Sequence, residues 1–425
     1  MRIQAVLAEP ALSGFYRDDQ AAIRAGSSHD GFLYAGTPVT EGFSEVREPG
    51  AAVTLMLVLD DGQVAVGDCA EVQYSGAGGR APVFSLDRAI AEVREHLAPF
   101  LVGRSVDHFR ALAEEVDRLH VDGRPLLTAV RYGISQALLQ AAALAAALTM
   151  AEVVQLEYGT DVPLASVPIY AQTGDDRRMN VDKMILKEVD VLPHGLINQV
   201  ETKLGWDGAL LLEYVTWLRD RILTVRRRED YVPRLHIDTY GTIGIAFDGN
   251  EAAIAEYLGV LAAAAAPFRL RIEHPIDAGS RDAQVTAFVA LRQALASREI
   301  DVELVVDEWC NTLDDIDLFV AARAADVVHV KMPDLGGVTN TIEALLTVRR
   351  SGLAAYCGGS CNETDVSARV SVHIAMACGA DQVLAKPGMG VDEGLMIVAN
   401  EMTRTLALAR GRTERALAEG VGATP

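Results

Sequence analysis

Residues 235–238 read Leu-His-Ile-Asp, and three later segments have the same form: Leu-Arg-Ile-Glu at 270–273, Leu-Val-Val-Asp at 304–307 and Val-His-Val-Lys at 328–331. Each is a short apolar run that ends in a charged residue. The charged residues are 35, 34 and 24 positions apart, about the length of one βα unit. Further apolar runs, mostly separated by helical patterns, lie at 167–170, 354–357 and 382–385. Seven such strands predict an (α/β) barrel, and the segment 191–194 is the candidate for the eighth strand.

The chain before the barrel has a different pattern. Two β-rich segments, 53–59 and 64–74, flank the turn signal Asp60-Asp61-Gly62 and predict a hairpin. Three helical patterns follow, at 86–101, 106–119 and 126–150. We therefore predict an α+β domain over 1–160, a (β/α) barrel over 161–412 and a loose tail over 413–425.

Composition excludes several classes of protein. The chain has 425 residues, of which 50% are hydrophobic and 23% charged, as in a packed globular protein. Its net charge of −21 would repel a phosphate backbone, and the one basic run, 226–228, fits a solvated helix end. We therefore expect no nucleic-acid partner.

The cysteines and the apolar segments bear on location. Five cysteines, an odd number, fit neither a disulfide framework nor a zinc motif, so we expect a reducing, cytoplasmic environment. The first nine residues lack the pattern of a secretory signal. The most apolar long stretch, 125–150, contains Arg131, Gln136 and Gln140, which favours a buried helix over a membrane span.

The four strand-end charges predict a metal site. In a parallel barrel the carboxyl ends of all strands emerge at one face, so Asp238, Glu273 and Asp307 should converge there. Their like charges need a cation, and three hard oxygen ligands suit Mg²⁺. Lys331 arrives on the next strand, beside this site. A single charged strand end commonly only begins a solvated loop, but four in consecutive units are much harder to explain that way.

This order of three acids and a lysine resembles the enolase superfamily, in which an α+β domain caps a modified TIM barrel. Closer phrases are similar to the methylaspartate ammonia-lyase family: His236-Ile237-Asp238-Thr239-Tyr240-Gly241, Glu273-His274-Pro275, Asp307-Glu308-Trp309-Cys310, Lys331-Met332-Pro333-Asp334 and Cys357-Gly358-Gly359-Ser360-Cys361-Asn362-Glu363-Thr364. The resemblance covers nearly the whole chain. It implies reversible loss of ammonia from 3-methylaspartate, giving mesaconate.

The resemblance also implies roles for single residues. Lys331 would be the base on one face of the reacting carbon, with its pKa lowered by nearby Mg²⁺. His194 would be the second acid–base residue and would serve the other C3 epimer; without the resemblance it is equally a turn residue beside Pro193 and Gly195. The implied substrate contacts are Gln172, Gln73, Leu384, Tyr170, His329, and the backbone amides of Ser360 and Cys361.

Three positions depart from the family pattern. His329 stands where the family generally has Gln, Tyr170 where Phe is usual, and Ser360 where Thr is usual. We expect His329 to face the barrel interior and to contact the substrate; the alternative is a histidine hydrogen-bonded inside the barrel without ligand contact. Gln73 and Leu384 could equally serve ordinary packing.

Two other functions stay open at this point. A lysine and a histidine on opposite faces of a substrate would also suit a racemase or epimerase of an amino or hydroxy acid. A non-catalytic metal-binding or scaffold protein of the same fold should have lost parts of this residue set. The resemblance further implies K⁺ near the Mg²⁺ site and a homodimer, with a small amino acid as the bound molecule and no membrane partner.

Overall fold

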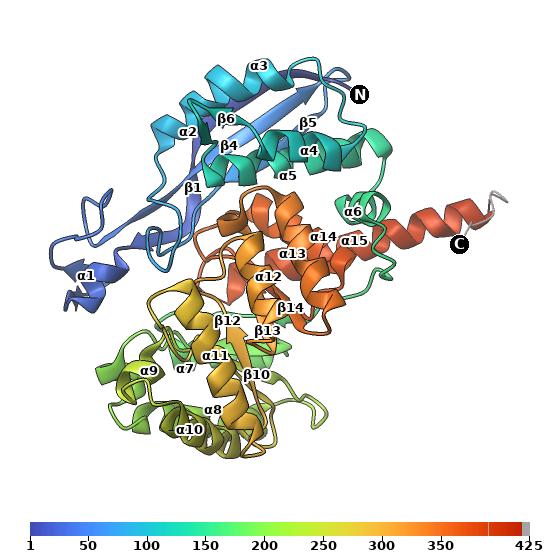
Figure 1. The fold of residues 1–425 in the computed structure, drawn as a ribbon. Helices are drawn as coiled ribbons and strands as arrows, with labels where there is room; N and C mark the ends of the chain where they lie inside the picture. Colours follow the sequence, from blue (N-terminus) through green and yellow to red (C-terminus); the bar gives the residue numbers. More distant parts are fainter. Residues whose placement is uncertain (390, 419–425) are drawn as a thin grey trace.

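The computed structural model describes residues 1–389 and 391–418. A closed barrel of eight parallel strands occupies the second part of the chain, with β8 and β9 closing it against β15 and β10 (Figure 1). Its strands are β8 (Ile169–Tyr170), β9 (Val191–His194), β10 (Arg234–Asp238), β11 (Leu270–Glu273), β12 (Val302–Val306), β13 (Val327–Val330), β14 (Ala354–Cys357) and β15 (Gln382–Leu384). The predicted barrel, including the eighth strand at 191–194, is confirmed.

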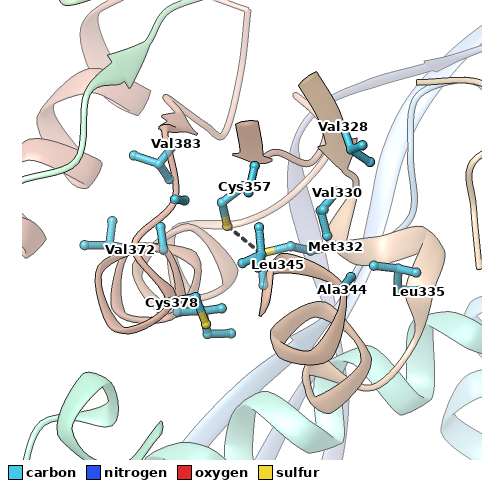
Figure 2. Close-up of a cluster of buried hydrophobic side chains, with 14 of the residues drawn as sticks. Val328, Val330, Met332, Leu335, Ala344, Leu345, Cys357, Val372, Cys378 and Val383 are labelled. Atoms are coloured by element: carbon cyan, nitrogen blue, oxygen red, sulfur yellow. Dashed lines mark hydrogen bonds between the residues drawn. The ribbon is translucent and has the colours of Figure 1, made fainter. Parts of the chain in front are cut away.

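Alternation along each strand separates the interior from the outer shell. On β13, Val328 and Val330 point outward and pack with Leu345 and Cys357 against the surrounding helices, as Figure 2 shows. Val327 belongs instead to the small cluster of apolar side chains inside the barrel. His329 and Lys331 share the face of Val327, so the same alternation directs both into the barrel interior.

Helices follow the strands and cover the barrel. They are α7 (Arg177–Leu186), α8 (Ala209–Val225), α9 (Thr242–Ala246), α10 (Glu251–Ala265), α11 (Arg281–Ala296), α12 (Leu313–Ala321), α13 (Val338–Arg350), α14 (Asp365–Cys378) and α15 (Asp392–Ala418), with short turns η2 (Val200–Leu204) and η3 (Met332–Leu335). The last helix runs through Ala418, so the predicted tail is wrong for 413–418, which are helical; 419–425 lie outside the described residues.

The first part of the chain is a sheet covered by helices. Strand β1 (Ile3–Asp18) pairs antiparallel with β4 (Arg47–Leu59), and β4 pairs with β5 (Val64–Cys69) across the predicted hairpin turn. The remaining elements are α1 (Gln20–Arg24), β2 (Ser28–Asp30), β3 (Leu33–Ala35), α2 (Leu86–Glu92), the π-helical η1 (Val93–Leu97), α3 (Ala98–Leu101), α4 (Phe109–Asp117), β6 (His120–Val121), β7 (Arg124–Pro125), α5 (Thr128–Ala146) and α6 (Met150–Tyr158). Strand β1 was not predicted from the sequence.

Several polar contacts join this cap to the barrel, and Figure 1 shows the cap (blue to teal) lying across one end of it. The hydroxyl of Tyr132 on α5 donates to Glu363, and the amide of Gly14 on β1 donates to the Glu363 carbonyl at 2.7 Å. The guanidinium of Arg80 contacts Asp334 at 2.9 Å. The cap is thereby fixed over the carboxyl ends of the strands.

The helix predicted over 126–150 corresponds to α5, which ends at Ala146, and an unpredicted helix, α6, begins at Met150. A left-handed residue, Ala147, ends α5, and Thr149 begins α6 with a capping box. No single helix among the described residues has the length and hydropathy for crossing a membrane, and only α5 and α6 taken together, bent by 93°, meet both criteria.

Candidate active site

A small cavity opens at the carboxyl ends of the barrel strands, beneath the cap. The two predicted acid–base residues, the three predicted metal ligands and most of the predicted substrate contacts line it: Gln73, Gln172, His194, Asp238, Glu273, Asp307, His329, Lys331, Ser360, Cys361 and Leu384. Residues up to 311 positions apart in the sequence therefore meet at one place.

The three carboxylates are almost completely buried, each with 4% or less of its surface exposed. One ligand atom from each of Glu273, Asp307 and His329 lies within 4.8 Å of the others. Asp238 is the predicted ligand outside this closest group, and its Oδ2 lies 3.5 Å from His194 Nε2. Burial and the charge of Asp238 raise the pKa of Glu273 to about 7.

Lys331 forms the closest cationic contact of this cluster. Its Nζ lies 2.7 Å from Asp307 Oδ2. Burial and the nearby Arg80 act to lower the pKa of Lys331, but Asp307 and two further carboxylates outweigh them, so the pKa lies above its ordinary value. The expected lowering by Mg²⁺ stays a prediction, since the protein's own groups act in the opposite net direction.

Arg80 is a cap residue that sequence reasoning missed. Its side chain is 1% exposed and lies 3.3 Å from Asp307, 3.6 Å from Glu308 and 2.9 Å from Asp334. Burial and Glu308 act to raise the pKa of Asp307, yet Lys331, His329 and Arg80 together hold it below its usual value. The cap therefore supplies a cation to the acidic floor of the cavity.

His194 ends β9 in a left-handed conformation, with φ of 69°. Its Nε2 lies 3.4 Å from the Tyr240 hydroxyl, and its Nδ1 is buried without a partner among the described residues. Because His194 lines the cavity, its imidazole is placed to exchange a proton with a bound molecule.

His329 has both ring nitrogens engaged by the protein. Its Nδ1 lies 2.6 Å from Glu273 Oε1, its Nε2 accepts from the amide of Gly359 at 3.2 Å, and its ring stacks on Tyr356 at 4.1 Å. In this arrangement neither nitrogen is free for a substrate carboxylate. The geometry is that of the alternative, a histidine hydrogen-bonded inside the barrel, although its ring borders the cavity.

In the glycine-rich turn after β14, one of the two backbone amides predicted to bind the substrate is already hydrogen-bonded within the protein. The amide of Ser360 donates to Glu363 Oε2 at 2.8 Å, so it stabilises the turn. The Ser360 hydroxyl accepts from the amides of Gln73 and Asn362, which leaves its own proton to donate into the cavity. Cys361 retains its amide as the other expected donor.

Two predicted substrate contacts from the cap and the first strand are held by neighbours. Gln73 Nε2 donates to Asp18 at 2.9 Å, and the Cys361 thiol lies 3.4 Å from Gln73 Oε1. Gln172 Nε2 makes only a long contact, 3.5 Å, to the Gly388 carbonyl. Gln172 is therefore the freer of the two amides to turn toward a ligand.

Tyr170 does not line the cavity, and this differs from the prediction. The ring is fully buried and stacks on His236 at 4.2 Å, while its hydroxyl donates to the His236 carbonyl at 3.2 Å. Alternation places it inside the barrel, as expected, but among the interior packing below the cavity. We do not retain Tyr170 as a substrate contact.

Further lining residues were not predicted: Val72, Tyr74, Arg80, Tyr240, Glu308, Tyr356 and Gly359. Tyr240 and Glu308 directly follow or lie close to predicted ligands within quoted motifs, so their place was readable from the sequence. Tyr74 ends the segment predicted as β-rich but lies beyond β5, in the same cap loop as Arg80, and neither was predicted to reach the cavity.

The donor set fits a divalent cation. Three buried carboxylates line one cavity, and burial together with the charges of Asp238 and Asp307 raises the pKa of Glu273 to about 7. Oxygen ligands of this kind suit Mg²⁺. Asp238, Glu273 and Asp307 are the residues that would hold it.

Comparison with known proteins decides the family. A model of the methylaspartate ammonia-lyase N-terminus matches residues 1–159, and a model of the C-terminus of the same family matches residues 161–411. The chain belongs to the methylaspartate ammonia-lyase family. Methylaspartate ammonia-lyase of Clostridium tetanomorphum is 56% identical over 97% of this chain and 100% of its own length, and that of Citrobacter amalonaticus is 50% identical over 96% and 99%.

Solved structures of the family agree with the fold. The Mg complex of the C. tetanomorphum enzyme superposes with a TM-score of 0.92, at 56% identity and covering 97% of this chain and all of that one. The C. amalonaticus enzyme containing (2S,3S)-3-methylaspartic acid gives 0.94, at 50% identity, covering 96% of this chain and all of that one. A muconate lactonizing enzyme, 18% identical with a TM-score of 0.59 over 89% of this chain and 85% of its own, shares the fold alone.

Proposed function

We propose that this protein is a Mg²⁺-dependent methylaspartate ammonia-lyase, which eliminates ammonia from 3-methylaspartate and gives mesaconate. The observation that supports this proposal most directly is that three carboxylates, Lys331 and His194 line one cavity. The relative solved as a Mg complex is 56% identical over nearly the whole chain. No observation favours a racemase or epimerase, and no part of the predicted residue set needed for proton abstraction is missing.

The carboxylates and the lysine divide the first step between them. Bound by Asp238, Glu273 and Asp307, Mg²⁺ would supply positive charge that stabilises a substrate carboxylate as the adjacent carbon loses its proton. Lys331, whose Nζ reaches the same carboxylate cluster, takes the C3 proton of one epimer. His194, which lines the same cavity, takes the proton of the other epimer.

The second step needs no further protein group. The electron pair of the broken C3–H bond forms the C2–C3 double bond while the C2–N bond breaks. The substrate amine is protonated, so the nitrogen takes the electron pair of the C2–N bond and leaves as neutral ammonia. The two carboxylates of the product keep their charges. The proton taken by Lys331 or His194 then returns to solvent.

The remaining lining residues hold the substrate. The Ser360 hydroxyl, the Cys361 amide and Gln172 donate to its carboxylates, and Leu384 borders the methyl group. Gln73 reaches in from the cap and closes the cavity above. A K⁺ site and a homodimer stay predictions from the family resemblance.

A substrate panel tests this proposal. Purified protein is incubated with Mg²⁺ and aspartate, 3-methylaspartate or larger 3-alkylaspartates, and the absorbance of the conjugated diacid is followed. We expect turnover of 3-methylaspartate, with rates falling as the alkyl group outgrows the pocket beside Leu384. Incorporation of solvent deuterium at C3 or C2 without release of ammonia would instead identify a racemase or epimerase and contradict the proposal.

A further inference from the structure

Glu273 is held between two imidazoles. Its Oε1 lies 2.6 Å from His329 Nδ1 and its Oε2 lies 2.8 Å from His236 Nε2. His236 is two residues before Asp238 on β10, and His329 two residues before Lys331 on β13, so alternation points both rings into the barrel. All three residues are at most 5% exposed.

Each imidazole has a donor on its other nitrogen. The amide of Gly359 can only donate, so His329 Nε2 accepts and the ring proton must lie on Nδ1, toward Glu273. For His236 the donor is the Gln382 amide group, 3.0 Å from Nδ1. Its ring proton therefore lies on Nε2, again toward Glu273.

The orientation of Gln382 is itself fixed. Its Oε1 accepts from the guanidinium of Arg271 at 2.7 Å, which directs its Nε2–H to His236. Arg271 is 1% exposed and also contacts Glu303 on β12 at 2.9 Å. A chain of hydrogen bonds thus runs down the barrel interior from Glu273 to its opposite end.

His329 also has no room to leave this position. A Cβ on Gly358 would come within 1.9 Å of its Nε2, so the backbone of the turn closes directly over the ring. Tyr356 stacks on one face of the imidazole. The glycine at 358 is what allows the Gly359 amide to approach the histidine.

We propose that His236 and His329 are positioning residues that donate to both oxygens of Glu273 and orient it as a metal ligand, with Gln382 and the Gly359 amide fixing the proton on each ring. This rests on the proposed function only in taking Glu273 as a Mg²⁺ ligand. His329 accordingly donates a hydrogen bond to the metal ligand Glu273, and it contacts neither the substrate nor the metal.

A glutamine at position 329 would keep a donor toward Glu273. A glutamine amide offers one N–H toward Glu273, as the histidine does. His329→Gln therefore preserves the donor, whereas His329→Leu removes it. Outer partners of metal ligands typically change metal affinity by about 10–100-fold when removed.

The first measurement reads the ring protons directly. Long-range ¹H–¹⁵N spectra of protein with ¹⁵N-labelled histidine distinguish the two tautomers, and the chain has only nine histidines. His236→Gln and His329→Gln assign the two resonances. We expect a protonated Nδ1 in His329 and a protonated Nε2 in His236, both unchanged when Mg²⁺ is added. Loss of the Nδ1 proton of His329 on metal addition would identify it as a ligand and overturn the proposal.

The second measurement is Mg²⁺ affinity by calorimetry on folded protein. We expect His329→Leu and Gln382→Met to weaken binding by about tenfold or more, and His329→Gln to stay within about threefold of wild type. His373→Leu is the matched control, because His373 pairs with Glu401 at 3.2 Å on α14 and α15, away from the cavity. It should lower stability without altering Mg²⁺ affinity.

The outcomes separate the two proposals. Equal Mg²⁺ affinity in wild type and His329→Leu would overturn the positioning role while leaving the lyase activity intact. Tight Mg²⁺ binding by wild type without turnover of 3-methylaspartate would overturn the proposed function and leave the positioning role standing.

Discussion

Lys386→Met should destabilise the protein strongly, although Lys386 lies outside the catalytic cavity. Its Nζ lies 2.9 and 2.8 Å from the two oxygens of Glu363 and 3.1 Å from the Gly358 carbonyl, and both side chains of the pair are 0% exposed. Removing the ammonium would leave the Glu363 charge buried, with only the Tyr132 hydroxyl and the Ser360 amide as partners. Breaking such a pair costs about 3–5 kcal/mol of the free energy of unfolding.

The assay is chemical unfolding followed by circular dichroism, with two comparison variants. The double variant Glu363→Gln, Lys386→Met removes both charges and should be less destabilised than Lys386→Met alone. Lys183→Met breaks the pair with Asp392, whose 2.7 Å distance is as short as that of the buried pair, but the Lys183 side chain is 38% exposed, so the loss of stability should be much smaller. If Lys386→Met costs no more than this surface control, the reasoning from burial is refuted.

Three further predictions follow from the site and its surroundings. Asp307→Ala removes a predicted ligand and the partner of Lys331, so Mg²⁺ affinity measured by calorimetry should fall at least tenfold; unaltered affinity would exclude Asp307 as a ligand. Lys331→Ala and His194→Ala should each reduce turnover of one C3 epimer of 3-methylaspartate, by about 10²–10⁴-fold, more than the other; equal losses for both epimers in both variants would contradict the assignment of faces. The hydrogen bond from His373, with help from Arg369, lowers the pKa of Glu401 from 4.5 to about 2, so its contribution to stability is present above pH 4.5 and is lost as pH falls toward 2. Glu401→Gln should therefore cost most above pH 4.5, and a cost independent of pH would show that the shift is absent.

The spacing of short apolar runs along the sequence was enough to predict the barrel. Four apolar runs with a charged last residue placed Asp238, Glu273, Asp307 and Lys331 at one end of a barrel, and the structure has them there. Alternation also placed His329 in the interior. The long strand β1 was missed, because Pro10 and Gly14 interrupt its pattern and its pairing partner β4 lies about forty residues away.

The sequence did not predict how deep a side chain lies in the barrel, or which cap residues contact the barrel. The alternation of side chains along a strand predicts which side chains point into the barrel, but it does not predict how deep along the barrel axis they lie. Tyr170 was therefore predicted at the cavity, whereas it lies below the cavity, against His236. Arg80 reaches Asp307 because a cap loop folds over the barrel, across 227 positions of sequence. The use of the Ser360 amide by Glu363 likewise depends on how one turn closes.

The most direct test of the central claim is the stoichiometry of products from 3-methylaspartate with and without Mg²⁺. Ammonia and the conjugated diacid are quantified in the same reaction for wild type and Lys331→Ala. We predict that wild type releases the two in equal amounts, only when Mg²⁺ is present, and that Lys331→Ala loses the reaction of one C3 epimer. Ammonia release that is independent of Mg²⁺, or no diacid at all from 3-methylaspartate, would contradict the account.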